Sequence, residues 1–139
     1  MKALDERCII LGMETTLKLA SVAIGGAFGA VARHLINISP LATAAGKFPL
    51  PTFVINVVGS FLIGLLFVFF GERTEVSENA RLALVVGFLG AFTTFSTFEL
   101  EIFSLARERQ TMMAVLYLLL SVVVGFIGVS AGVALGRRL

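Results

Sequence analysis

The chain has 139 residues, of which 58% are hydrophobic and 14% are charged, and its formal net charge is +2. This composition lies outside the range of soluble globular proteins and indicates a membrane protein. The sequence has no basic cluster, one cysteine and one histidine, which argues against nucleic-acid binding, an internal disulfide and an enzyme.

Charge-free windows predict four transmembrane helices, and they cover residues 19–32, 48–71, 82–98 and 110–136. A spanning helix needs about 20 mostly apolar residues, so the second and fourth windows are long enough alone. The first window is long enough if it continues to about Ile38, and the third if it continues past Glu99. We therefore expect an all-α membrane domain over residues 19–139. Residues 1–18 form a polar segment before it, an amphipathic or disordered extension.

The basic residues near the helix ends are almost balanced between the two sides of the membrane. The side that holds both termini and the connection between the second and third helices has five of them, namely Lys18, Arg73, Arg81, Arg137 and Arg138. The other side holds four, namely Arg33, Lys47, Arg107 and Arg109. Because basic residues near helix ends set orientation, this count leaves two alternatives open. The chain inserts with both termini inside, or it inserts in both orientations.

The first helix carries small residues and one cation on the same face. Gly25 and Gly29 lie four positions apart, a spacing that lets another helix approach closely. Arg33 follows four residues later on that face. It either reaches from the helix end to the lipid headgroups, or it is a buried cation that attracts anions into a vestibule.

The second helix repeats small or polar residues at every fourth position, namely Asn56, Ser60 and Gly64. A polar amide on such a face points at protein rather than lipid. Asn56 either bonds to a neighbouring helix or donates to a passing anion. Its amide offers two N–H groups without a full charge, which suits an ion that must bind and then leave.

Residues 90–98 of the third predicted helix are the stretch around which the rest of the chain is arranged. Four of the five positions from Thr93 to Thr97 carry hydroxyl groups, although an apolar residue such as leucine is better suited to a lipid environment. Hydroxyls compete with the helical hydrogen bonds, and Gly90 weakens the same turn. We therefore predict a helix broken at its middle. Such backbone is tolerated only beside protein or a water-filled cavity, and its freed carbonyls are suited to hold an ion.

Aromatic and acidic residues follow in the same helix. Phe95 and Phe98 share a face, and their positive ring edges offer an anion a weak attraction, although most membrane phenylalanines face lipid or core. Glu99 and Glu101 are about 200° apart, so only one of them faces the interior. Either this carboxylate is functional, or it belongs to a solvated helix end.

The fourth helix has the most regular spacing, with Tyr117, Ser121 and Gly125 followed by Gly128, Gly132 and Gly136. Glycine at every fourth residue predicts close packing against another helix. The two hydroxyl groups either extend a polar face or belong to an interfacial tyrosine and an ordinary packing serine.

Over residues 19–139 the chain resembles the CrcB, or Fluc, family of fluoride channels. The resemblance rests on residues 29–33, on residues 56–64 and above all on residues 87–98, with Glu101 following at the family's offset. It implies a multi-pass protein of the prokaryotic plasma or inner membrane. Its function would be fluoride-selective, passive export from the cytoplasm, which lowers fluoride toxicity.

The same resemblance implies an antiparallel, dual-topology homodimer with two pores. Asn56 would offer its amide to fluoride, and Phe95 and Phe98 of the partner's third helix would line the pore. A polar track and vestibule would comprise Ser96, Thr97, Glu101, Tyr117, Ser121 and Arg33. The carbonyls of Gly90 and Thr93 would bind a structural Na⁺ at the dimer interface.

Two other functions compete with this expectation. A small dual-topology multidrug-type transporter is also a short four-helix chain, but proton-coupled export needs a buried acid, usually in the first helix. None lies between Lys18 and Arg33. A passive structural subunit would have no need of the hydroxyl-rich stretch, which makes membrane insertion less favourable.

Overall fold

The computed structural model describes residues 2–72 and 76–139, with side chains for 11–71 and 76–139, and the regular elements within these residues are all helices. The helices in chain order are α1 (Lys2–Asn37), α2 (Leu41–Ala44), α3 (Leu50–Glu72), α4 (Glu78–Arg81), the π-helix η1 (Leu82–Leu89), α5 (Gly90–Phe92), α6 (Phe95–Arg107) and α7 (Thr111–Gly136).

Within the described residues, four stretches are long and apolar enough to cross a membrane, which confirms the predicted number. They are Leu11–Asn37, Leu50–Gly71, Glu78–Arg107 and Thr111–Gly136. The first begins before the predicted start at residue 19, because α1 continues as one helix through the polar residues that precede it. Within it, Lys18 forms an ion pair of 2.8 Å with Glu78 at the start of the third span.

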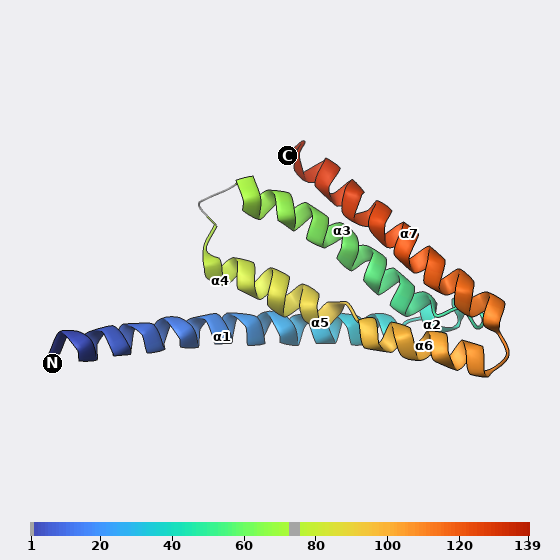
Figure 1. The fold of residues 1–139 in the computed structure, drawn as a ribbon, viewed down its shortest axis with the longest axis horizontal. Helices are drawn as coiled ribbons and strands as arrows, with labels where there is room; N and C mark the ends of the chain where they lie inside the picture. The colour runs from blue at the N-terminus through green and yellow to red at the C-terminus, as the bar shows by residue number, and fades with distance from the viewer. Residues whose placement is uncertain (1, 73–75) are drawn as a thin grey trace.

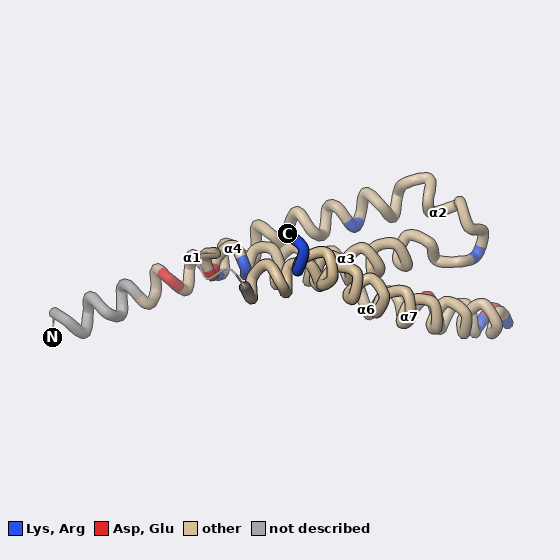
Figure 2. The backbone as a smooth tube through the Cα atoms, turned by 90° about the horizontal axis from the view of Figure 1, so that it is seen from above, with Lys and Arg blue, Asp and Glu red and all other residues tan. Residues whose placement is uncertain are grey.

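The four spans are arranged in two side-by-side pairs (Figure 1). α1 packs along η1 and α5, and α3 packs along α7. The α6–α7 connection lies at one end of the long axis, α1 extends past the other helices toward the opposite end, and the C-terminus lies about midway between them. Charged residues lie mainly near α4 and the C-terminus and at the end that holds the α2 and α6–α7 connections, with few between these two regions (Figure 2).

Glycines hold each pair together, as the four-residue spacings predicted. A methyl group at Gly29 would collide with the backbone carbonyl of Phe88, so α1 and η1 touch through their backbones. A methyl group at Gly132 would collide in the same way with the carbonyl of Phe61 in α3. The first span therefore packs on the third, and the second on the fourth.

The third candidate span changes both conformation and partner along its length. α5 ends at Phe92, after which Thr93 (φ −77°, ψ 159°) and Thr94 (φ −150°, ψ 121°) are extended. Before these two residues the segment packs on α1, whereas α6 packs mainly on α7. The extended pair thus lies where the chain passes from one helix pair to the other. The π-helix that precedes it was not anticipated from the sequence.

Candidate functional site

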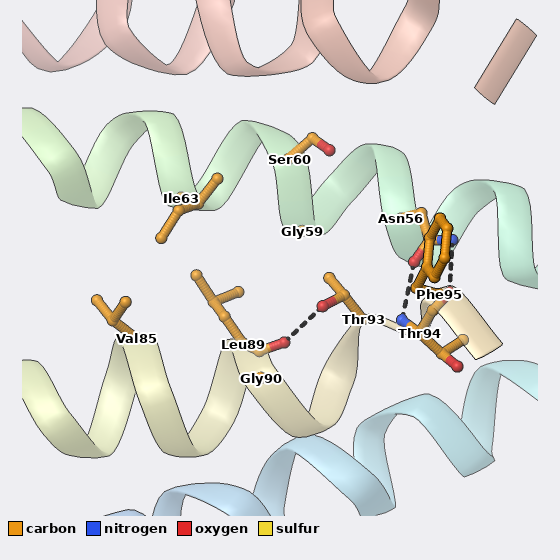
Figure 3. Close-up of a pocket in the computed structure, with 10 residues that line it drawn as sticks. All are labelled: Asn56, Gly59, Ser60, Ile63, Val85, Leu89, Gly90, Thr93, Thr94 and Phe95. Atoms are coloured by element: carbon orange, nitrogen blue, oxygen red, sulfur yellow. Dashed lines mark hydrogen bonds between the residues drawn. The ribbon is translucent and has the colours of Figure 1, made fainter. Parts of the chain in front are cut away.

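An open cavity of about 400 Å³ lies between α3 and the third span, beside the two extended residues (Figure 3). Its lining includes Asn56, Gly59 and Ser60 from α3, and Gly90, Thr93, Thr94 and Phe95 from the third span. Four residues selected from the sequence, Asn56, Gly90, Thr93 and Phe95, are therefore brought together at one cavity.

The side chain of Asn56 bonds to both backbone groups of Thr94. Its Nδ2 donates to the Thr94 carbonyl at 3.1 Å, and its Oδ1 accepts from the Thr94 N–H at 3.0 Å (Figure 3). The neighbouring Gly59 makes this approach possible, because a methyl group there would collide with Cγ2 of Thr93. One Nδ2 hydrogen of Asn56 remains beyond the one bonded to Thr94.

The other polar groups of the extended pair also have partners within the subunit. The N–H and hydroxyl of Thr93 both donate to the carbonyl of Leu89, at 3.0 and 2.8 Å. The hydroxyl oxygen of Thr94 caps α6 by accepting from the N–H of Thr97 at 3.3 Å, and it donates to the Thr97 hydroxyl at 2.9 Å. Threonine is a preferred residue at such a helix start.

These hydrogen bonds use two backbone N–H groups that would donate to backbone carbonyls in a continuous α-helix. There the carbonyl of Gly90 would accept from Thr94, and that of Thr93 from Thr97. Here the Thr94 N–H donates to Asn56 and the Thr97 N–H to the Thr94 hydroxyl. The carbonyls of Gly90 and Thr93, which were selected from the sequence as metal ligands, are therefore among those that lose their α-helical donors at the break.

Arg33 of α1 reaches the same backbone from the opposite side. Its side chain is half-buried, and Nη1 lies 3.5 Å from the carbonyl oxygen of Thr93. At this distance the contact is a long hydrogen bond, assisted by the positive charge. The guanidinium therefore lies against the third span rather than only at the membrane surface.

A second polar cluster lies farther along α6, at Glu101. Its carboxylate accepts from the Thr52 hydroxyl and from the Tyr117 hydroxyl, each at 2.8 Å. Both donors are buried, with Thr52 2% and Tyr117 0% exposed. Glu99 is exposed, so Glu101 is the acid that faces the interior, and Tyr117 is a buried residue rather than an interfacial one.

Aromatic rings connect the cavity to this cluster. Phe95 is 73% exposed at the mouth of the cavity, whereas Phe98 is only 6% exposed. Their ring centroids are 6.1 Å apart, and the Phe98 ring meets that of Tyr117 edge-on at 5.0 Å. Phe48, from the connection between the first two spans, covers Tyr117 from another side at 5.3 Å.

The remaining selected residues lie apart from the cavity lining. Ser96 and Thr97 are exposed on the first turn of α6. The hydroxyl oxygen of Ser121 is buried and has no hydrogen-bond partner among the described side chains and backbone. Thr52 was not among the residues selected from the sequence, although it continues the four-residue spacing of Asn56 and Ser60. Phe48 carried no signal that set it apart from the other phenylalanines.

Four apolar stretches of membrane length in the described part of the chain, one of them with polar, extended backbone at its middle, make this chain a multi-pass membrane protein. The family described as "CrcB-like protein, Camphor Resistance (CrcB)" matches residues 20–133, and the chain belongs to that family. The resemblance inferred from the sequence is therefore confirmed.

Three curated relatives are similar over nearly their whole length. The "Fluoride-specific ion channel FluC" of Hahella chejuensis is 46% identical over 119 residues, covering 86% of this chain and 94% of the relative. Proteins of the same name from Agrobacterium fabrum and Acidobacterium capsulatum are 45% and 42% identical over 123 residues, each covering 88% of this chain and 98% of the relative. The chain is a multi-pass bacterial membrane protein.

Proposed function

We propose that this protein is a fluoride-selective channel that lets cytoplasmic fluoride leave the cell by passive electrodiffusion. The observation that carries the proposal is the 42–46% identity to fluoride-specific channels over almost their entire length. It is not an enzyme. Export down the electrochemical gradient requires no coupled energy source and lowers the toxicity of fluoride inside the cell.

The chemistry of the cavity suits an anion that must bind weakly and leave again. Asn56 has one N–H group beyond the one bonded to Thr94, and it brings no full charge. The rings of Phe95 and Phe98 present positive edges, which attract an anion without trapping it. Beyond the rings, the hydroxyls around Glu101, together with Ser96, Thr97 and Ser121, form a polar track, and Arg33 draws anions toward its entrance.

The third span functions as one membrane helix broken at its middle, and two antiparallel copies pair across the break. The exposed ring of Phe95 at the cavity mouth supports this arrangement, because a second copy would cover it. The partner's phenylalanines would then face Asn56 of this subunit. The same arrangement of Asn56 and the other copy's phenylalanines occurs twice in such a dimer, which gives two pores.

A sodium ion fits the break, because hard cations prefer oxygen ligands. The carbonyls of Gly90 and Thr93 lack their α-helical donors, and these two carbonyls from each of two copies would together supply four oxygens. The ion would offset the carbonyl dipoles gathered there. It is a structural ion, distinct from the permeating fluoride.

A multidrug-type transporter of similar size is less consistent with the chain. Proton-coupled export requires a buried acid, usually in the first span, whereas the acid that the first span contains, Glu14, is exposed near its start. The buried acid of this protein, Glu101, lies in the third span and is bonded to two hydroxyl groups.

Anion release from liposomes tests the proposal. Liposomes that contain the purified protein and are loaded with fluoride should empty rapidly into fluoride-free buffer, with or without a proton gradient. The same liposomes loaded with chloride should retain it. Equal release of both anions would refute the selectivity, and release only with a proton gradient would refute the passive mechanism.

A further inference from the structure

We propose that Asn56 is a positioning residue that holds Thr94 extended and thereby keeps the carbonyl of Gly90, a residue of the cavity lining, free of its α-helical donor. This inference rests on the proposed channel function, in which the cavity belongs to the ion path. It assigns the Asn56 side chain a task that is separate from donating to the anion.

The side-chain amide of Asn56 and the backbone of Thr94 exchange two hydrogen bonds, as two peptide groups can. The carboxamide of Asn56 has one donor and one acceptor side by side, and Thr94 offers the complementary pair at 3.1 and 3.0 Å. Thr94 is only 8% exposed, so water does not readily replace either bond. Buried backbone groups need partners, and here both partners come from one side chain.

Removal of the Asn56 carboxamide would change which bonds the backbone favours. The Thr94 N–H would lose its acceptor, and the nearest alternative for it is the i−4 carbonyl of Gly90. Formation of that bond would extend α5 through the break and occupy the Gly90 carbonyl. The side chain of Asn56 therefore competes directly with the helix for the Thr94 amide.

The requirement for both a donor and an acceptor makes asparagine specific at this position. An aspartate at position 56 would keep an oxygen for the Thr94 N–H but would lack the donor to the Thr94 carbonyl. An alanine would lack both. The two substitutions therefore separate the contribution of each bond.

Nuclear magnetic resonance of threonine labelled with ¹³C and ¹⁵N reports this bond directly. Only two Thr–Thr pairs occur in the sequence, Thr15–Thr16 and Thr93–Thr94, so a spectrum linking each amide to the preceding carbonyl contains two signals. Thr16 lies in α1 and serves as the internal reference. The Cα and Cβ shifts of Thr94 distinguish extended from helical backbone. The measurement uses the full chain in lipid nanodiscs and fluoride-free buffer.

We expect Asn56→Ala to move the Thr94 shifts from extended toward helical values and to reduce fluoride release from liposomes at least tenfold. Asn37→Ala, the same change at an exposed position at the end of α1, should alter neither. Asn56→Asp should leave the Thr94 amide nitrogen close to its wild-type shift. It should also move the signal of the Thr94 carbonyl, read through a labelled Phe95 amide.

Three results would overturn the inference. One is loss of fluoride release in Asn56→Ala with unchanged Thr94 shifts, since Asn56 would then act only on the anion. Another is helical Thr94 shifts with wild-type release. If Asn56→Ala does not fold, an unchanged Thr94 carbonyl signal in Asn56→Asp would overturn it. A wild-type protein that releases no fluoride would instead refute the channel function.

Discussion

Two phenylalanines three residues apart have opposite environments in the subunit. Phe98 packs against Tyr117 inside the helix bundle, whereas Phe95 is largely exposed at the cavity mouth. Replacement of Phe95 therefore removes little packing within the subunit, but replacement of Phe98 also disturbs the core around Glu101. The two residues allow the role of the ring in conduction to be separated from its role in packing.

We predict that Phe95→Ile reduces fluoride release from liposomes at least tenfold and leaves thermal unfolding in detergent unchanged. An aliphatic side chain keeps the apolar bulk but loses the positive ring edge that an anion meets. Phe103→Ile is the matched control, because Phe103 is an exposed residue of α6 outside the cavity lining. Wild-type release from Phe95→Ile would contradict the ring-edge contribution.

Individual site residues were predictable from the sequence where a polar side chain occurs within an otherwise apolar, membrane-spanning segment. The hydroxyls of residues 93–97, the amide of Asn56 and the acid Glu101 were all identified in this way. Their partners were not predictable, because helical spacing fixes the face of a residue but not the group across from it. The bonds from Asn56 to Thr94 and from Thr52 to Glu101 depend on how helices pack.

The close packing of α1 on η1 depends on glycines, which have no side chain at the contact. Backbone meets backbone at Gly25 and Gly29, so the two helices lie closer than side chains would allow. This contact fixes the position of the third span up to the extended residues. It also holds Arg33 within reach of the Thr93 carbonyl.

We predict that Gly29→Ala destabilises the folded protein by about 1–3 kcal/mol, the usual range for an overpacked site. The added methyl group would collide with the Phe88 carbonyl, and backbone yields less readily than a side chain. The midpoint of thermal unfolding in detergent should fall. Gly12→Ala is the control, since nothing lies within 4 Å of its added methyl group. Equal midpoints for the two variants would show that the contact is looser than described.

Element by element, the sequence predicted the number of spans but not the form of the third. Charge-free length is a property of composition, so the four windows could be read directly. The eight residues of η1, LALVVGFL, are all apolar or glycine. No polar face exists there whose spacing would distinguish a π-helix from an α-helix.

The whole molecule has nearly balanced basic charge at its two ends, which is what insertion in both orientations requires. An antiparallel dimer can form only if both orientations occur in the same membrane. We predict that Leu139→Cys, in a chain with Cys8→Ser, is labelled by membrane-impermeant maleimide from both sides of the membrane. Each side should account for about half of the labelling. Labelling from one side only would contradict the antiparallel pairing.

Current through a planar bilayer that contains the purified protein tests passive, selective fluoride conduction most directly. With a fluoride gradient across the bilayer, we predict a current that reverses at the equilibrium potential of fluoride. The reversal potential should stay there when chloride replaces an impermeant anion on one side. A reversal potential that moves toward that of chloride, or no current with fluoride as the only small anion, would contradict the account.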